Sequence, residues 1–288
     1  MNPSLNLKGH SGCFIDIKQN NESFFVRKST SDIAYNDRLN IQMDKQIHFF
    51  DQCNSSDYFL TTDILSHGFS NNHFWFDMDY VHGLKALDYF ALCDVNSLNI
   101  FTQQLIKYFD NQIDSSEIIA SPSNVIMNKI EALSQILVAD SKIDDEIHSE
   151  LFSFLENNIP TENIYHYQCH GDFTLSNMIF TDGHVYTIDF LDSFIDSPLI
   201  DIVKLRQDTH IERIFCIDTN VDKIRINRAK ITVKYIDQMT HEYIKKNHIL
   251  NSWYSYLQVL NLARILPYTR CSIELNFLLS NIKKLILL

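Results

Sequence analysis

The feature that most limits the possible folds of this chain is a change in hydrophobic period near Gly83. Before Gly83, short segments alternate apolar and polar residues, which is typical of half-buried strands. After it, apolar residues recur at spacings of three and four over long runs, which is typical of amphipathic helices. We therefore predict an α+β protein of two lobes, a sheet-rich lobe over 1–83 and a mainly helical lobe over 84–288, with the chemistry in a cleft.

The first lobe is predicted to contain two pairs of strands and one helix. The first pair covers residues 7–29, where Gly9 and Gly12 allow a tight approach of the backbone before the first strand is complete. Residues 36–50 have the apolar spacing of a helix that packs on the strands, and 64–83 reads as two further strands.

The second lobe is predicted to be helical except for one loop and strand-turn-strand unit within 164–190. The Asp182-Gly183 pair supplies the turn of that unit. The helices are predicted over 96–110, 122–139, 143–157, 198–208, 228–247, 253–266 and 272–287.

The charge and composition exclude some classes of function. The 288-residue chain is 45% hydrophobic and has a formal net charge of −12, so a folded globule is expected. Binding along a nucleic-acid backbone requires clustered lysine and arginine, which the sequence lacks. We therefore expect no nucleic-acid partner, and any anionic ligand must be held by a local site.

The cysteines and the apolar segments indicate a cytoplasmic protein. No cysteine pair has the spacing of a disulfide framework or a metal site, so we expect buried free thiols in a reducing compartment. The first residues do not resemble a secretory signal, and no apolar segment has bilayer-spanning length. The six cysteines are Cys13, Cys53, Cys93, Cys169, Cys216 and Cys271.

Polar residues gather in the strand-turn-strand unit, in the segments HGDFTLSN (170–177) and VYTIDF (185–190). A core needs none of these groups, although Asp189 between Ile188 and Phe190 has the alternative reading of a satisfied core carboxylate. Burying a charge without a partner is costly, which favours a metal or a hydrogen-bond cage around Asp189. His170 is predicted to be a structural hydrogen-bonding residue rather than the base.

Phosphoryl transfer requires a carboxylate at the acceptor hydroxyl, oxygen ligands for Mg²⁺ and a cation on the nucleotide phosphates. Asp172 is the candidate carboxylate, and Asn177 and Asp189 are the candidate metal ligands. Lys28 or Arg27 is the candidate cation.

These two segments resemble the catalytic loop and the metal-binding strand of the aminoglycoside phosphotransferase and choline kinase family. The same pattern resembles the paired motifs of protein kinases, with glycine in place of arginine. The resemblance implies a two-lobed protein-kinase-like fold, with an antiparallel-sheet N-lobe of about five strands and a mainly helical C-lobe. It implies ATP and Mg²⁺ as cofactors and a small-molecule hydroxyl as acceptor.

Other segments resemble the family in the same order along the chain. GHSGCF (9–14) is similar to the glycine loop, FFVRK (24–28) to the strand with the phosphate-binding lysine, and FDMDYVHG (76–83) to the linker between lobes. The resemblance implies that backbone donors of the glycine loop cover the phosphates and that the linker main chain binds adenine. The residues implied are Gly9, Ser11, Gly12 and Lys28 for the phosphates, and Asp77, Met78, Asp79 and Tyr80 for the base.

Two assignments depart from the family pattern. Side chains alternate along a strand, so only one of Arg27 and Lys28 points into the site, and we predict Lys28 with Val26 beside the adenine. The family also pairs this lysine with a glutamate of the following helix, and residues 36–50 contain none. The replacement is Asp44, a neutral Gln42 or Gln46, or nothing equivalent.

Acidic residues follow the metal-binding strand. The resemblance implies that Asp201 supports the catalytic loop, and Pro198 is expected in the first turn of a helix capped by Ser197. Asp192 and Asp196 lie nearer the site. Asp192 either joins the metal shell, receives the acceptor or is a solvated loop charge.

The sequence does not select the acceptor among amino alcohols such as choline and ethanolamine, sugars, amino sugars and aminoglycosides. It does not indicate the oligomeric state either. An aromatic group near the C-terminus fits either a box for a quaternary ammonium or helix-packing core. The alternative functions are a protein kinase, and a noncatalytic pseudokinase that acts as a nucleotide-binding interaction module. The aromatic group is Trp253, Tyr254, Tyr256 and Tyr268.

Overall fold

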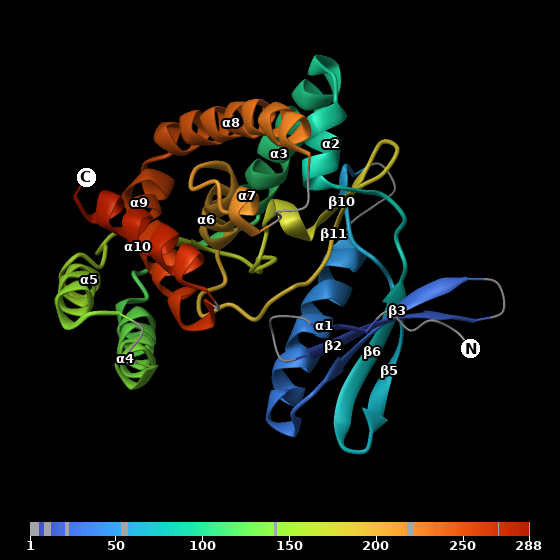
Figure 1. Cartoon of the computed structure of the whole chain (residues 1–288), viewed down its shortest axis with the longest axis horizontal. Helices are drawn as coiled ribbons and strands as arrows, with labels where there is room; N and C mark the ends of the chain where they lie inside the picture. Colours follow the sequence, from blue (N-terminus) through green and yellow to red (C-terminus); the bar gives the residue numbers. More distant parts are fainter. Residues whose placement is uncertain are drawn as a thin grey trace. The chain divides into compact units, whose positions relative to one another are not determined.

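The protein is described by a computed structural model, shown in Figure 1, which covers residues 6–8, 13–20, 23–52, 57–140, 143–217, 222–269 and 271–287. Contacts between Cα atoms group the chain into two compact units. The sheet unit is Met1–Tyr89, His170–Asp172 and Ser176–Asp192, and the helical unit is Phe90–Cys169, Phe173–Leu175 and Ser193–Leu288. The division by sequence position, at residue 83, stays a prediction.

The main sheet of the sheet unit has five strands in the order β1-β2-β3-β6-β5, and every neighbouring pair is antiparallel. The predicted antiparallel N-lobe sheet is therefore confirmed. Asn71 and Asn72 join β5 to β6 with positive φ angles of 49° and 65°, which is the geometry of a tight hairpin turn that follows the strand twist. The strands are β1 (Asn6–Lys8), β2 (Cys13–Gln19), β3 (Phe24–Thr30), β5 (Ile64–Ser70) and β6 (His73–Asp79).

One helix, α1 (Asn36–Gln52), covers a face of this sheet, preceded by the 3-10 turn η1 (Ile33–Tyr35). Leu39 and Met43, one turn apart, bury their side chains against apolar residues of β6. Removing this apolar surface from water holds the helix on the sheet. The predicted helix over 36–50 matches α1.

A second, four-stranded sheet in the order β4-β11-β10-β7 contains the predicted strand-turn-strand unit. The hairpin of β10 (Met178–Phe180) and β11 (Val185–Thr187) turns at Gly183, whose φ is 88°. The outer strands, β4 (Phe59–Leu60) and β7 (Leu84–Lys85), were not predicted because two residues are too few to show a period.

Gly83, just before β7, lies against β10. A Cβ atom at Gly83 would lie 2.5 Å from the carbonyl oxygen of Phe180 and 2.7 Å from a methyl carbon of Ile179. Because one of these neighbours is backbone, only glycine fits without displacing the strand. Gly83 is therefore a packing requirement of the second sheet.

The helical unit consists mainly of helices, as predicted, and α6 lies among α3, α8 and α9. Pro198 is in the first turn of α6, and the Ser197 hydroxyl accepts a hydrogen bond from Leu199 N–H at 3.3 Å, the predicted cap. A short strand pair, β8 (Glu117–Ile119) with β9 (Ile164–His166), interrupts the helices. The helices are α2 (Ala86–Leu92, which begins in the sheet unit), α3 (Val95–Asp114), α4 (Ser123–Asp140), α5 (Asp145–Asn157), α6 (Pro198–Thr209), α7 (Ile214–Ile217), α8 (Lys223–Lys246), α9 (His248–Ala263) and α10 (Ser272–Ile286), with 3-10 turns η2 (Leu175–Asn177) and η3 (Leu266–Tyr268).

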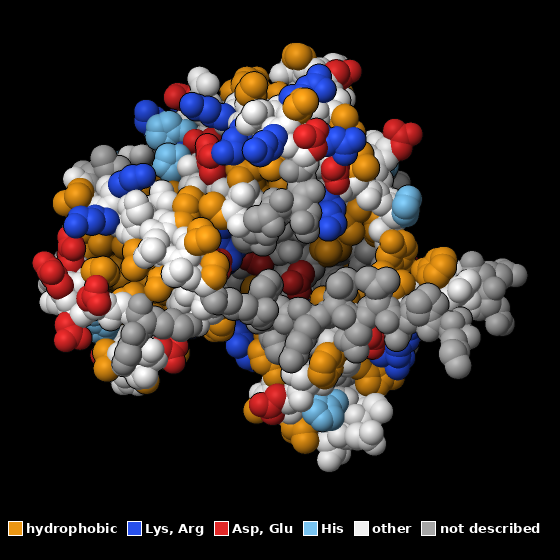
Figure 2. All heavy atoms as spheres, in the orientation of Figure 1, with side chains coloured by type: hydrophobic (Ala, Val, Ile, Leu, Met, Phe, Trp, Pro, Cys, Tyr) orange, Lys and Arg blue, Asp and Glu red, His pale blue; other side chains and the backbone are white. Residues whose placement is uncertain are grey.

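The surface carries charges of both signs. Figure 2 shows lysine and arginine side chains interspersed with acidic ones on the face in view. Among the described residues, no helix is both long and apolar enough to cross a bilayer. The five described cysteines are free, but Cys216 and Cys271 are exposed, so the expectation that the thiols are buried is wrong for these two.

Candidate active site

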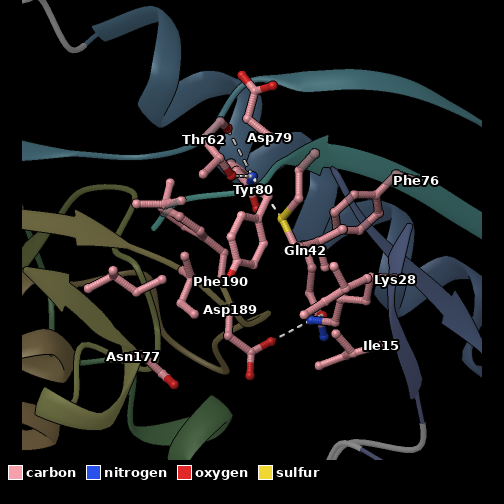
Figure 3. Close-up of a pocket in the computed structure, with 17 residues that line it drawn as sticks. Ile15, Lys28, Gln42, Thr62, Phe76, Asp79, Tyr80, Asn177, Asp189 and Phe190 are labelled. Carbon is pink, nitrogen blue, oxygen red and sulfur yellow. Dashed lines mark hydrogen bonds and ion pairs between the residues drawn. The ribbon is translucent and has the colours of Figure 1, made fainter. Parts of the chain in front are cut away.

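A pocket of about 310 Å³ opens on the face of the main sheet, and all its lining residues belong to the sheet unit (Figure 3). Neighbouring strands contribute matched residues: Ile15 is paired with Lys28, and Ile17 with Val26. On the other side of β3, Lys28 is paired with Phe76 and Val26 with Met78. These six residues all line the pocket, so one sheet face forms an apolar wall that holds a single cation.

The neighbouring cation, Arg27, lies on the opposite face of β3. Its guanidinium makes two hydrogen bonds to Asp77, at 2.6 and 2.8 Å, and lies 3.9 Å from the centre of the Trp75 ring. Alternation along the strand thus separates the two cations, and only Lys28 points into the pocket, as the strand period predicts.

Lys28 is 3% exposed and has two partners. Its ammonium group donates to Asp189 Oδ1 at 2.5 Å and to Gln42 Oε1 at 3.0 Å (Figure 3). Burial alone would lower the pKa of Lys28, but the charge and hydrogen bond of Asp189 outweigh burial and raise the pKa above its ordinary value. Lys28 is therefore charged at neutral pH.

Gln42 of α1 is the helix residue that accepts a hydrogen bond from Lys28. Of the alternatives from the sequence, it is the one that contacts Lys28. Gln46, one turn further, instead donates to the carbonyl oxygen and hydroxyl of Thr62 at 3.0 and 2.9 Å. Asp44 accepts a hydrogen bond from Asn40 on the exposed side of α1.

Asp189 follows β11 with a φ of 65°, in the left-handed region that residues other than glycine rarely adopt. Such backbone strain persists where the surrounding structure imposes it, often at functional sites. The Asp189 side chain is 34% exposed, so its carboxylate is paired with Lys28 and also accessible from solvent.

The catalytic-loop residues Asp172 and Asn177 contact each other directly. The Asn177 side-chain amide donates to Asp172 Oδ2 at 2.8 Å and to the Asp172 carbonyl oxygen at 2.9 Å. These two bonds fix the orientation of the Asp172 carboxylate. They also turn the amide nitrogen of Asn177 towards Asp172, so neither bond uses its Oδ1.

His170 supports this loop as a neutral side chain. Its Nδ1 accepts a hydrogen bond from the backbone N–H of Asp172 at 3.2 Å, and its ring packs 4.1 Å from that of Phe190. Burial lowers the pKa of His170 to about 4. A neutral, buried imidazole agrees with the structural role predicted for His170.

The helical unit holds the next residues of the loop through a carboxylate that the sequence analysis missed. Asp208 of α6, which is 1% exposed, accepts a hydrogen bond from Leu175 N–H at 2.9 Å. Asp201, the residue predicted to support the loop, lies two turns earlier on the same helix, is fully buried and accepts from Tyr108 Oη at 3.5 Å. The signal in the sequence was the spacing of seven residues, or two helical turns, which places Asp208 on the same face of α6 as Asp201.

The linker residues divide between the two faces of the sheet. Met78, Asp79 and Tyr80 line the pocket, together with Val81, which the sequence analysis did not select. Asp77 is not among the lining residues, because its side chain pairs with Arg27 on the other face. The predicted glycine-loop residues Gly9, Ser11 and Gly12 lie outside the described residues.

The acidic residues after β11 also have partners. Asp192 pairs with Arg38 of α1, a residue that the sequence analysis did not select. Asp196 Oδ1 accepts a hydrogen bond from the Cys169 thiol at 3.5 Å. Asp192 is thus an ion-paired residue, and its roles in a metal shell or at the acceptor stay predictions.

The aromatic group near the C-terminus does not assemble into a box. Trp253 and Tyr256 are buried and donate to the carbonyl oxygens of Asn163 and Leu155, at 3.1 and 3.0 Å. Tyr268 is 67% exposed. The helix-packing interpretation therefore holds for the buried members.

Within the described residues, no group of three or more histidine, cysteine, aspartate or glutamate side chains could hold a metal ion. The predicted Mg²⁺ ligands are one carboxylate and one amide, so they form a different kind of site. Mg²⁺ commonly takes one or two protein oxygens and completes its shell with water and phosphate oxygens. Asn177 Oδ1 and the accessible carboxylate of Asp189 fit that requirement.

Comparisons with known proteins agree with the resemblance. The model of the phosphotransferase enzyme family matches residues 131–223, which contain both HGDFTLSN and VYTIDF. No curated protein gives a significant sequence match. The resemblance to this family is confirmed by the family model and by the solved structures that the fold resembles.

The similar structures have low sequence identity, and they show the fold. A thermostable mutant of an aminoglycoside phosphotransferase, in a ternary complex with ADP and hygromycin B, has a TM-score of 0.61 at 11% identity, over 98% of this chain and 92% of that one. A fructosamine-3-kinase homologue from Haemophilus somnus 129PT has 0.55 at 12%, over 99% and 90%. A choline/ethanolamine kinase family protein from Mesorhizobium loti has 0.50 at 13%, over 99% and 88%. The two-lobed kinase-like α+β fold is therefore confirmed.

Proposed function

We propose that this protein is a small-molecule kinase that transfers the γ-phosphoryl group of ATP, with Mg²⁺, to a hydroxyl group of its acceptor. The observation that carries the proposal is the pair of contacts at the pocket. Asn177 orients the Asp172 carboxylate, and Lys28 pairs with Asp189 in a pocket with an apolar wall. A fixed carboxylate, a buried cation and an accessible carboxylate are the parts that phosphoryl transfer needs.

Asp172 is the proposed base. The acceptor oxygen bonds to the γ-phosphorus while the bond from that phosphorus to the β,γ-bridging oxygen breaks. ADP leaves with the electron pair of that bond, and the acceptor proton passes to the Asp172 carboxylate. The bonds from Asn177 keep this carboxylate in one orientation, which lowers the cost of reaching the transition state.

Nucleotide binding is assigned to residues of the sheet unit. Lys28 neutralises the α- and β-phosphates, and backbone donors of Gly9, Ser11 and Gly12 cover them. The purine lies against the apolar wall, beside Val26, with its edge on the main chain of the linker from Asp77 to Tyr80. In this proposal residues 1–83 are the nucleotide-binding lobe and 84–288 contain the catalytic loop.

Mg²⁺ would be held by Asn177 Oδ1 and Asp189, whose chemistry suits it. When bound, the ion neutralises phosphate charge. Asp189 would then hold the ion in place of its contact with Lys28, which would leave Lys28 for the nucleotide phosphates. The 34% exposure of the Asp189 side chain supports such an exchange.

The proposed acceptor is a hydroxyl of an amino alcohol, sugar, amino sugar or aminoglycoside. Similar structures include a glucosamine kinase in complex with glucosamine, ADP and inorganic phosphate, at 11% identity and a TM-score of 0.52, over 94% of this chain and 76% of that one. A protein substrate fits less well, because only residues 190–197 separate Asp189 from α6 and leave little room for an activation segment. The free cysteines support a reducing, cytoplasmic location.

The test is consumption of Mg·ATP against a panel of amino alcohols, sugars, amino sugars and aminoglycosides, with the Asp172→Asn variant alongside. We expect turnover with at least one acceptor and a loss of about 10³-fold in kcat in the variant. Nucleotide binding should persist in the variant, because Asp172 is not among the residues that line the pocket. Equal turnover by the variant and the wild type would refute the assignment of Asp172.

A second candidate, a noncatalytic pseudokinase, is favoured by one observation, the neutral Gln42 at the place of the helix glutamate. This candidate predicts that the wild-type protein binds Mg·ADP but consumes no ATP with any acceptor. The same assay therefore separates the two candidates.

A further inference from the structure

A chain of contacts joins both carboxylates of the segment after β11 to one face of α1. Asp189 contacts Lys28, which contacts Gln42, and the Gln42 amide donates to the Tyr35 hydroxyl at 3.2 Å. The Arg38 guanidinium lies 4.9 Å from the centre of the Tyr35 ring. The chain of contacts therefore reaches from Asp189 to Arg38.

Arg38 in turn forms an ion pair with Asp192. Its Nη2 donates to Asp192 Oδ1 at 2.9 Å, and its Nε donates to Oδ2 at 3.1 Å. A bidentate arginine-carboxylate pair fixes direction as well as distance. The pair thus holds α1 against the segment that contains Asp189, only three residues away from Asp192.

The spacing along the helix explains why one face makes all these contacts. Arg38 and Gln42 of α1 are four residues apart, so they lie on one side of the helix, and Tyr35 belongs to the 3-10 turn η1 that precedes it. Near the other end of α1, the Phe49 ring packs 5.3 Å from that of Phe190. The segment from Asp189 to Asp192 is therefore held on α1 by two contacts. Phe190 packs on Phe49, near the end of the helix, and Asp192 pairs with Arg38, near its start.

The charges show why the ion pair matters. In kinases, an ion pair between the strand lysine and a helix glutamate must form for the site to be active. Here the helix contributes the neutral Gln42, and a hydrogen bond from the charged Lys28 to a neutral amide is weaker than a pair of opposite charges. If Asp189 held a metal ion instead of Lys28, the only contact of α1 in this group would be the bond between Lys28 and the neutral Gln42. Those two residues alone would give α1 no ion pair with the site.

We propose that Arg38 and Asp192 are positioning residues that supply this connection in place of the lysine-glutamate pair. Their ion pair sets the place of α1 relative to the metal-binding segment, and so the places of Lys28 and Asp189. The inference rests on the proposed function. Arg38 is 50% exposed and Asp192 28%, so the pair should contribute little to folding stability, and its effect should appear in turnover.

The experiment is a double-mutant cycle with Arg38→Gln, Asp192→Asn and both together, measured by kcat, by KM for ATP and by Kd for Mg·ADP. We expect each single variant to lower kcat about tenfold with a smaller change in KM, because the pair positions groups that act on the transferring phosphate. The double variant should lose no more than either single variant, because both changes remove one interaction. Arg38→Lys should recover part of kcat, since it keeps the charge but loses the bidentate geometry.

Arg213→Gln is the matched control, because Arg213 forms an ion pair with Glu274 at 2.8 Å within the helical unit, and neither residue lines the pocket. We expect this variant to keep the wild-type kcat. Thermal midpoints of the Arg38 and Asp192 variants should stay within about 2 °C of the wild type. A fall in midpoint that parallels the fall in kcat would mean a general loss of structure and would overturn the inference.

Two results separate this inference from the proposed function. Losses that multiply to about hundredfold in the double variant, or a wild-type kcat in Arg38→Gln, overturn the inference alone. If the wild type binds Mg·ADP but transfers no phosphoryl group, the proposed function fails. The inference then requires that the Kd values for Mg·ADP show the same non-additive effects in the double-mutant cycle. If the wild type binds no nucleotide, both fail.

Discussion

Lys28 in the sheet unit and Arg206 in the helical unit are both buried cations that pair with an aspartate, with 3% and 2% of their surfaces exposed. Their surroundings differ. Arg206 makes two bonds to Asp237, at 2.8 and 3.2 Å, with His241 Nδ1 at 3.3 Å and the Tyr254 ring 4.7 Å away. Lys28 lines a pocket and pairs with a carboxylate that is one-third exposed and strained in its backbone.

The difference separates a structural cation from one suited to a ligand. Arg206 is enclosed, and Asp237 accepts a further hydrogen bond from the Thr209 hydroxyl at 3.2 Å, so the pair has little reason to exchange partners. Lys28 has an accessible partner and open volume beside it. Similar burial thus has different consequences, depending on whether the partner can be replaced.

The largest expected effect that tests this comparison is on activity, with Lys28→Met. We expect kcat/KM to fall about 10³-fold, because the phosphates lose their cation. The thermal midpoint should change little, since Asp189 can be solvated when its partner is removed. Assays of turnover and thermal unfolding on the same preparation check both. A large loss of stability would place Lys28 in the same class as Arg206.

The second effect is on stability, with Arg206→Met. This change leaves the Asp237 carboxylate without its cation in a mostly buried site, so we expect the free energy of unfolding to fall by about 3–5 kcal/mol. Chemical denaturation measures the fall. Arg206→Lys, which keeps the charge, is the control and should lose less. At low temperature the folded Arg206→Met protein should bind Mg·ADP like the wild type, and lost binding would contradict the comparison.

The smallest effect is the pH dependence of the Arg206 pair. Burial alone would raise the pKa of Asp237, but hydrogen bonds from His210 and Arg206, with the Arg206 charge, lower it to about 2. Because the folded-state pKa lies below the unfolded value of 3.8, Asp237 stabilises the fold above that value and loses the contribution as the pH falls towards 2.

This contribution amounts to about 2 kcal/mol. Denaturation at a series of pH values between 7 and 2 measures the free energy of unfolding. This free energy should fall more steeply with falling pH in the wild type than in Asp237→Asn, which has no carboxylate to protonate. Identical pH slopes for the two proteins would show that Asp237 is not held by a cation in the folded state.

Much of the site follows from periods along the chain. Alternation along a strand is enough to place Lys28 and Val26 on one face and Arg27 on the other. The helical run over 36–50 shows that no glutamate can meet Lys28, and the structure selects Gln42 from the remaining candidates. These features depend on the direction of side chains along a single strand or helix, so they can be predicted from the sequence.

Contacts between distant residues were not predictable in this way. Arg38 and Asp192 are 154 positions apart, and Leu175 and Asp208 belong to different elements. Each pairing depends on where packing brings the elements together, which no local period records. The exposed positions of Cys216 and Cys271 were missed for the same reason, because exposure depends on the neighbours that a folded chain supplies.

Gly83 has a consequence for mutational scans. It lies at the surface and is not among the residues that line the pocket, yet any side chain there would meet the Phe180 carbonyl. A map of tolerated substitutions would therefore show Gly83 as an intolerant position, although it does not line the pocket. Reading function from such a map requires separating residues that act on a ligand from residues that merely leave room for a neighbouring strand.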